Sequence, residues 1–265
     1  MDAAASSIER DGIGCTTKLE QTLFDDMNGL CRELMAELLA AGAATARDYL
    51  AEPGERNAGN HGKRIVTLFG ELPEIKRTYY WDEDSRTGHY PFDDRLGLVG
   101  RYTPAAANEM VRCAVSHPYR DAADAFSRNH GFRVSADTMR EVVGLYRAES
   151  TAFARKSEPS PASDADSRAS TVCVMADGTG MPMRKECLHG VKGKDGRAKT
   201  REVKAGVIES GCKTVVGQRF KQSGMIWSLK GAKALLPLRT LYKSGRLDEF
   251  FSHLVKDLPQ VDCAA

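Results

Sequence analysis

The sequence predicts an α+β protein that is mostly helical and has two parts joined by a linker. Three observations support this prediction. Apolar residues recur at helical spacing in several segments, two short apolar strands flank turn residues near position 70, and residues 157–170 are almost entirely Ser, Pro, Ala and Asp. With 42% hydrophobic residues among 265, the chain can bury a core, so wholesale disorder is not expected.

The longest predicted element is an amphipathic helix at residues 18–50. A polar loop to Gly62 then leads to two predicted strands, residues 63–68 and 74–80, which form a small hairpin around a Gly and Pro turn. The helix is indicated by apolar residues at three-and-four spacing, namely Leu19, Leu23, Met27, Leu30, Leu34 and Leu38.

Three further helices are predicted between residues 102 and 150. One starts near Pro104, one covers about 119–129, and one runs from Ser135 to about Tyr146, with Gly131 separating the last two.

The last two of these helices fit two interpretations. A capping serine, Ser135, opens the third helix, and a helix, a glycine turn and a second helix rich in polar residues suit a helix-turn-helix. Thr138 and Arg140 would then face the major groove of DNA. An ordinary helical hairpin has the same pattern and is the more frequent structure.

The C-terminal part is predicted to contain two strands followed by three helices. An apolar run at 171–176 predicts a buried strand that ends at Asp177, and residues 200–208 predict its partner. The predicted domains are therefore a helical N-terminal region at 1–156, a linker at 157–170 and a second domain at 171–265. Helices are expected at 214–222, 229–242 and 247–254.

Charge is distributed unevenly along the chain. Residues 181–246 contain sixteen basic and four acidic side chains, a net +12, so the remainder must carry −10 to give the overall +2. Such a basic block suits a face that meets a phosphate backbone, although a solvated lysine-rich face gives the same composition.

The seven scattered cysteines form no metal-ligand spacing and are expected to be free thiols. Because the sequence contains neither a membrane-spanning run nor a secretion signal, we expect no membrane partner and a cytoplasmic protein.

Two acids stand where a metal-dependent enzyme would need them. Asp177 follows the predicted buried strand, and Glu209 follows an apolar pair just before a basic segment that contains Lys213, Arg219 and Lys221. Two-metal phosphoryl-transfer sites require acids that converge on ions about 4 Å apart. The alternatives are an ordinary Asp-Gly turn and an exposed glutamate that caps a helix.

Three blocks of sequence resemble the Kra-type insertion-sequence transposases, which are DDE recombinases with an RNase-H-like core. The first block runs from Arg77-Thr-Tyr-Tyr80 through Tyr90-Pro-Phe-Asp-Asp94 to Val134-Ser-Ala-Asp-Thr138. The second joins Asp177-Gly-Thr-Gly-Met-Pro182 to residues 193–204. The third joins Gly206-Val-Ile-Glu-Ser-Gly-Cys-Lys-Thr214 to Arg219-Phe-Lys-Gln-Ser-Gly-Met225 and Trp227-Ser-Leu-Lys-Gly-Ala232.

The resemblance implies a DNA transposase that cuts and joins DNA with Mg²⁺ or Mn²⁺. Asp177 matches the first catalytic and metal-binding aspartate, and Glu209 matches the closing glutamate. Ser135, Thr138 and Arg140 match the recognition helix, while Lys213, Arg219 and Lys221 would hold the DNA backbone. Element ends and target DNA are the implied partners, together with a full-length transposase or further copies of the chain. No zinc is expected, because the paired cysteines of many relatives are absent from residues 81–89.

The chain departs from the family at the second catalytic aspartate, which has no counterpart. Only 31 residues separate Asp177 from Glu209, too few for the strands of a whole RNase-H-like core. The junction at residues 204–207 therefore indicates an internal deletion and an incomplete core. We expect a defective transposase, and the alternative is a non-catalytic DNA-binding remnant that competes with the full-length enzyme.

Overall fold

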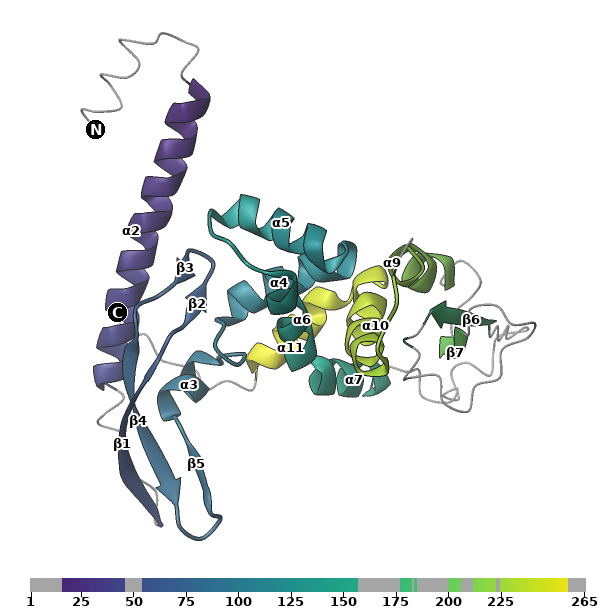
Figure 1. Cartoon of the computed structure of the whole chain (residues 1–265). Coiled ribbons are helices and arrows are strands. Elements are labelled where there is room, and N and C mark those ends of the chain that lie inside the picture. The colour runs from purple at the N-terminus through teal and green to yellow at the C-terminus, as the bar shows by residue number, and fades with distance from the viewer. Residues whose placement is uncertain are drawn as a thin grey trace, which may run out of the picture. The chain divides into compact units, whose positions relative to one another are not determined.

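The computed structural model describes residues 16–45, 54–156, 177–182, 184, 200–205, 212–222 and 225–256 (Figure 1). For residues 155–156, 177–182, 200–205 and 212–213 it describes the backbone only. The architecture is α+β and mostly helical, as the sequence predicts. Two compact units share the chain. The first contains the described residues up to Asn108 together with Asp124–Val134, and the second contains Glu109–Ala123 and the described residues from Ser135 to Lys256.

The predicted long helix is α2, Thr16–Thr45, in the first unit. Its expected end, residues 46–50, lies outside the described residues. Near its C-terminal end α2 buries Ala43, but much of its apolar stripe is exposed, with Leu38 at 66%. The helical spacing of this segment was therefore predictable, whereas the burial of its stripe was not.

The small sheet of the first unit differs from the predicted hairpin. β4, Ile75–Asp82, pairs antiparallel with β1, Glu55–Lys63, on one side and with β5, Thr87–His89, on the other. The expected partner segment supplies only β2, Val66–Thr67, which pairs with β3, Gly70–Glu71. The prediction failed because β1 is polar and almost wholly exposed, so it has no apolar alternation.

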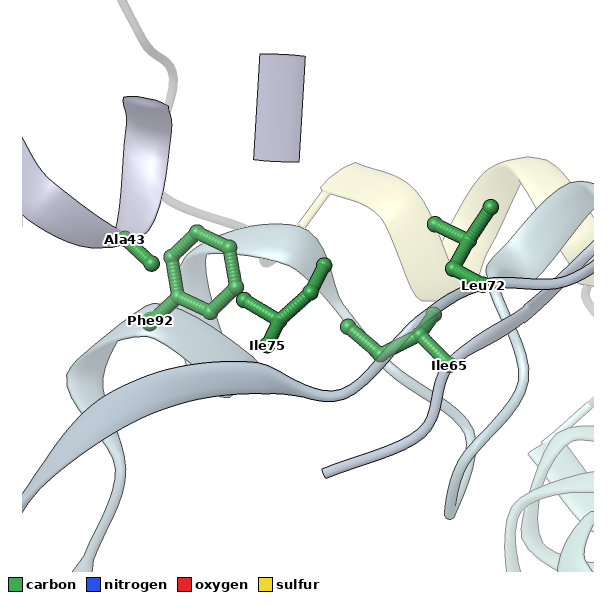
Figure 2. Close-up of a cluster of buried hydrophobic side chains, with 5 residues drawn as sticks. All are labelled: Ala43, Ile65, Leu72, Ile75 and Phe92. Carbon is green, nitrogen blue, oxygen red and sulfur yellow. The ribbon is translucent and has the colours of Figure 1, made fainter. Parts of the chain in front are cut away.

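A compact apolar cluster joins α2 to this sheet and to a short helix, α3, Pro91–Leu96. Figure 2 shows its side chains, which come from α2, β4, α3 and the residues next to β2 and β3. Asp93 of α3 strengthens the junction because it accepts from Lys63 Nζ at 2.8 Å and Arg77 Nε at 2.7 Å. The cluster consists of Ala43, Ile65, Leu72, Ile75 and Phe92.

The three helices predicted between residues 102 and 150 are confirmed. They are α4, Pro104–Ser116, α5, Tyr119–His130, and α6, Ala136–Leu145. Gly131 has a φ of +72°, a left-handed conformation that favours glycine, and it follows the last residue of α5. α6 begins at the predicted serine cap, since Ser135 Oγ accepts from Thr138 N at 3.0 Å.

The second unit is built on α10, Leu229–Lys243, which packs against α6, α7 and α11. α10 and α11, Leu247–Lys256, match predicted helices, whereas α7, Arg147–Lys156, was not predicted. The predicted helix at 214–222 is a π-helical turn, η5, Cys212–Gly217, followed by α9, Gln218–Phe220. Tyr146, Phe153, Phe250 and Phe251 form an aromatic cluster in this unit.

These packing partners divide the chain differently from the predicted domains. α6 and α7 were placed in the N-terminal domain at residues 1–156. They pack on α10, however, which follows the linker at 157–170 in the sequence. The linker composition is therefore not the border between the two compact units. The linker itself lies outside the described residues.

The described strands of the C-terminal part form a two-stranded antiparallel sheet. β6, Asp177–Pro182, pairs with β7, Thr200–Ala205, and Asp177 stands opposite Ala205. β7 falls within the predicted strand at 200–208. Asp177 is the first residue of β6, whereas the sequence placed it just after a strand at 171–176, a segment outside the described residues. The RNase-H-like core stays a prediction.

Candidate nucleic-acid interface

The N-terminus of α6 holds two of the predicted DNA-binding residues in its cap. Ser135 Oγ accepts from the Thr138 amide and also lies 3.0 Å from Thr138 Oγ1. Ser135 is exposed and Thr138 is half-buried. The two hydroxyls therefore define where α6 starts and are engaged with each other. Their contact with DNA bases stays a prediction.

Arg140 is the best placed of the predicted residues. Its side chain is 54% exposed, forms an ion pair with Asp137 one turn earlier, and lies 5.4 Å from the centroid of the Tyr119 ring. An exposed ion pair of this kind contributes little to stability. Arg140 can therefore exchange Asp137 for a phosphate at small cost.

Arg219 is not a surface residue, although the sequence placed it among the cations that would hold the DNA backbone. It is fully buried, its Nε donates to the Ala114 carbonyl at 3.0 Å, and its Nη1 points to Met225 Sδ at 3.7 Å. Burial lowers its pKa to about 10, so it is still a cation at neutral pH. Val215 and Val216 precede it at helical spacing, and this apolar face is buried.

A second buried arginine, Arg239 of α10, also donates a hydrogen bond at the C-terminal end of α4. Its Nη1 donates to the Val115 carbonyl at 2.6 Å, and its Nη2 donates to the Thr214 carbonyl at 2.9 Å. Arg219 and Arg239 thus supply donors to the last turn of α4, whose carbonyls have no partner within the helix. Sequence reasoning missed Arg239, although it lies four residues after Leu235 on the buried face of α10.

The other two predicted DNA-binding cations are Lys221 and Lys213. Lys221 follows α9 and is exposed. Lys213 lies in η5, and its side chain is outside the described residues. Both roles in DNA binding stay predictions.

A hollow lies at the start of α10 between the α6 helix and the segment before α10. Its volume is about 240 Å³, smaller than the roughly 300–1,000 Å³ of most small-molecule pockets. Its size therefore suits a small ion or one group of a larger ligand. The polar and aromatic side chains that line it are Tyr119, Arg140, Arg184, Arg219, Trp227 and Ser228.

Two further hollows continue from the first along α6, α7 and α10. The second shares Tyr119, Arg140, Ser228 and Gly231 with the first, and the third shares Gly144 and Arg147 with the second. Because neighbouring hollows share lining residues, they form one groove, which we call the α6–α10 groove. All of its lining residues lie in the second unit.

The α6–α10 groove is rich in positive charge. Five exposed cations line it, whereas its acidic lining residues are Asp137 and Glu141. α6 contributes both acids, so the excess of positive charge lies along α10 and toward α7. The five exposed cations are Arg140, Arg147, Arg184, Lys230 and Lys233.

The predicted catalytic and metal-binding acids cannot be placed together. Asp177 opens β6, but only its backbone is described, and Glu209 is outside the described residues. Within the part of the chain that the structure describes, no group of three or more His, Cys, Asp or Glu side chains could hold a metal ion. Binding of Mg²⁺ or Mn²⁺ at Asp177 and Glu209 stays a prediction.

The comparisons with known proteins give one family. The model of a family described as an uncharacterised protein family (UPF0236) matches residues 15–183, from the start of α2 to just after β6. No curated protein and no solved structure matches the chain. Among the described helices, none is both long and apolar enough to cross a membrane.

Proposed function

Because the chain belongs to the uncharacterised protein family UPF0236, whose description names no activity, we propose its function from the α6–α10 groove and from the sequence. The protein is a DNA-binding descendant of an insertion-sequence transposase, defective in strand cleavage and transfer. The observation that carries the DNA-binding part is the set of five exposed cations along one groove.

The spacing of these cations suits a polyanion better than a single small ligand. They come from α6, from the start of α7, from the residue Arg184 and from the first two turns of α10, so they follow the groove over several turns of helix. Each phosphate that a lysine or arginine neutralises releases condensed counterions, and this release supplies most of the affinity. If three to five of the cations contact phosphates, log K should fall with log salt at a slope of about −3 to −4.5.

The β6–β7 hairpin supports the defective form of the enzyme. Asp177 pairs with Ala205, and Glu209 follows Ala205 by only four residues, so the interval that would carry further strands and the second aspartate is missing. Two metal ions held in line with a scissile phosphate need more carboxylates than this pair. The protein would then occupy element ends and compete with a full-length transposase.

Paired charge-removal variants test the groove directly. In one variant Arg147→Gln and Lys233→Gln remove two groove cations, and in a matched control Arg56→Gln and Arg64→Gln remove two exposed cations of the first unit. We expect the groove variant to weaken binding to duplex DNA at least tenfold at moderate salt and to reduce the salt slope by about 2, with little change in the control. Equal losses in both variants would contradict the assignment of the groove.

Base recognition is tested separately at Arg140. Arg140→Ala should weaken binding to DNA from the element's ends more than binding to random duplex, because a residue that reads bases carries sequence preference. A loss of the same size on both duplexes would limit Arg140 to phosphate contact and remove the support for helix-turn-helix recognition.

A further inference from the structure

We propose that the hollow at the start of α10 binds the terminal phosphate of a DNA strand. This inference rests on the DNA-binding function proposed above and adds a defined ligand at one end of the α6–α10 groove. Three features of the hollow carry it: a buried guanidinium and a buried hydroxyl that each have a donor without a partner among the described residues, and the N-terminus of a long helix.

Arg219 lines the hollow and has an unused donor. Its Nε is taken by the Ala114 carbonyl, but its Nη2 is buried and has no hydrogen-bond partner among the described residues. The described residues also provide no carboxylate in an ion pair with Arg219. The guanidinium lies 5.1 Å from the Tyr119 ring centroid and 5.2 Å from that of Trp227, so two aromatic rings hold it in place. A buried guanidinium with an unused donor is stabilised when it binds an anion.

The Tyr119 hydroxyl is a second buried group without a partner in the described part of the chain. Burial raises the pKa of this phenol, so it stays protonated and can donate to an anion. Tyr119 lines the same hollow as Arg219. The two residues that carry these donors therefore line one small space.

The N-terminus of α10 faces the same space. Ser228 and Gly231 line the hollow, and Ser228 Oγ caps the helix by accepting from Gly231 N at 3.0 Å. α10 has 15 residues, and the N-terminus of a helix of this length favours a negative charge. A Cβ at Gly231 would lie 3.1 Å from Ser228 Oγ and would crowd this cap.

Two exposed arginines stand at the rim. Arg140 reaches the hollow from α6, and Arg184 is held beside it because its backbone N donates to the Trp227 carbonyl at 2.7 Å. Asp137 pairs with Arg140 at this rim, and Asp121 acts electrostatically on Arg219. With Arg219, three cations thus surround the space, which matches the double negative charge of a phosphate monoester.

A terminal phosphate fits this hollow better than an internal one. An internal diester has a nucleoside on each side and carries a single charge, so it fits a hollow of about 240 Å³ less well than a group at the end of a strand. A monoester projects from the strand end and presents three oxygen acceptors. It can enter the hollow while the duplex follows the rest of the groove.

The chain provides its own reporter for the test. It has two tryptophans, and one of them, Trp227, lines the hollow, so Trp81→Phe leaves a single fluorophore there. In this background, titration with inorganic phosphate should change the Trp227 emission. The same protein is then measured against two duplexes that differ only in a 5′-phosphate or a 5′-hydroxyl, and we expect about tenfold tighter binding of the phosphorylated end.

Tyr119→Phe is the decisive variant because it removes only the hydroxyl that lacks a partner. Its folding should be unimpaired, since a buried unsatisfied polar group is lost, while the preference for the 5′-phosphate should fall about fivefold. Arg147→Gln is the matched control, because Arg147 lines the groove but not this hollow. It should weaken both duplexes equally and leave the preference intact.

The outcomes separate this inference from the proposed function. Salt-dependent binding of both duplexes with no preference for the 5′-phosphate would overturn the terminal-phosphate site and leave DNA binding standing. An unchanged preference in Tyr119→Phe would also overturn it. A phosphate-induced change in Trp227 emission, lost in Tyr119→Phe, in a protein that binds neither duplex would support the anion site and overturn the DNA-binding function.

Discussion

Replacing Arg239 with methionine should destabilise the second unit strongly. Arg239 is 3% exposed and donates to the carbonyls of Val115 and Thr214, with a longer contact of 3.4 Å to Gln218 Oε1. Methionine keeps most of the apolar stem but provides no donor. The buried Val115 carbonyl at the end of α4 would then lose its partner.

The size of this effect follows from the bonds that are lost. Leaving a buried acceptor unsatisfied costs about 1–3 kcal/mol, and hydrogen bonds from a charged donor are each worth about 1.5–3 kcal/mol. Relief from burying the cation offsets part of this loss. We therefore expect a decrease of about 2–4 kcal/mol in the free energy of unfolding. The midpoint should fall by about 5–15 °C, given roughly 2–4 °C per kcal/mol.

Thermal and urea unfolding, followed by circular dichroism, measure this change. Arg56→Met is the matched control, because Arg56 is 67% exposed and its ion pair with Glu83 is at the surface, so less than about 0.5 kcal/mol should be lost. If Arg239→Met unfolded within about 0.5 kcal/mol of the parent protein, the buried arginine would not stabilise the end of α4.

Three further predictions concern local structure. Asp93→Ala removes the carboxylate that two largely buried cations share and should cost about 3–5 kcal/mol by urea unfolding, whereas a loss below 1 kcal/mol would contradict the network. Burial and the neighbouring Glu109 raise the pKa of the Cys113 thiol to about 11, so at pH 8 Cys113 should alkylate at least tenfold more slowly than the half-buried Cys31 in peptide mapping; equal rates would contradict its burial. Gly88→Ala places a Cβ 2.8 Å from the Tyr80 carbonyl and should lower the midpoint, and an unchanged midpoint would show that the β4–β5 turn yields easily.

Helices with a clear apolar face were predictable from the sequence. α4, α5, α6, α10 and α11 all fall where the sequence predicted helices, and the capping serine gave the start of α6 within one residue. These features are local, because a cap and an amphipathic stripe depend on residues within one or two turns.

Elements stabilised by distant partners were not predictable. β1 is polar and exposed, and it becomes a strand because the backbone of β4 pairs with it. α7 packs on α10 across a long stretch of sequence, and its own apolar pattern is weak. The residues of β1 and α7 alone therefore do not predict these elements, because the stabilising contacts come from β4 and α10.

The candidate site was predictable only in part. Arg140 lines the α6–α10 groove, whereas Arg219 is buried although composition counted it with the surface cations. Helical spacing could have separated them, because Arg219 follows Val215 by four residues and shares its buried face. Arg184 and Lys230 belong to the groove only through the folding of separate segments, which no pattern in one segment shows.

The central claim is that this chain binds DNA through the α6–α10 groove without cutting it. Its most direct test is incubation of the purified protein with labelled duplex from the ends of its element, with Mg²⁺ or Mn²⁺, scored for both retardation and cleavage. We predict salt-sensitive retardation without cleavage. Absence of retardation at low salt would contradict DNA binding, and site-specific nicking that Asp177→Ala abolishes would contradict the loss of catalysis.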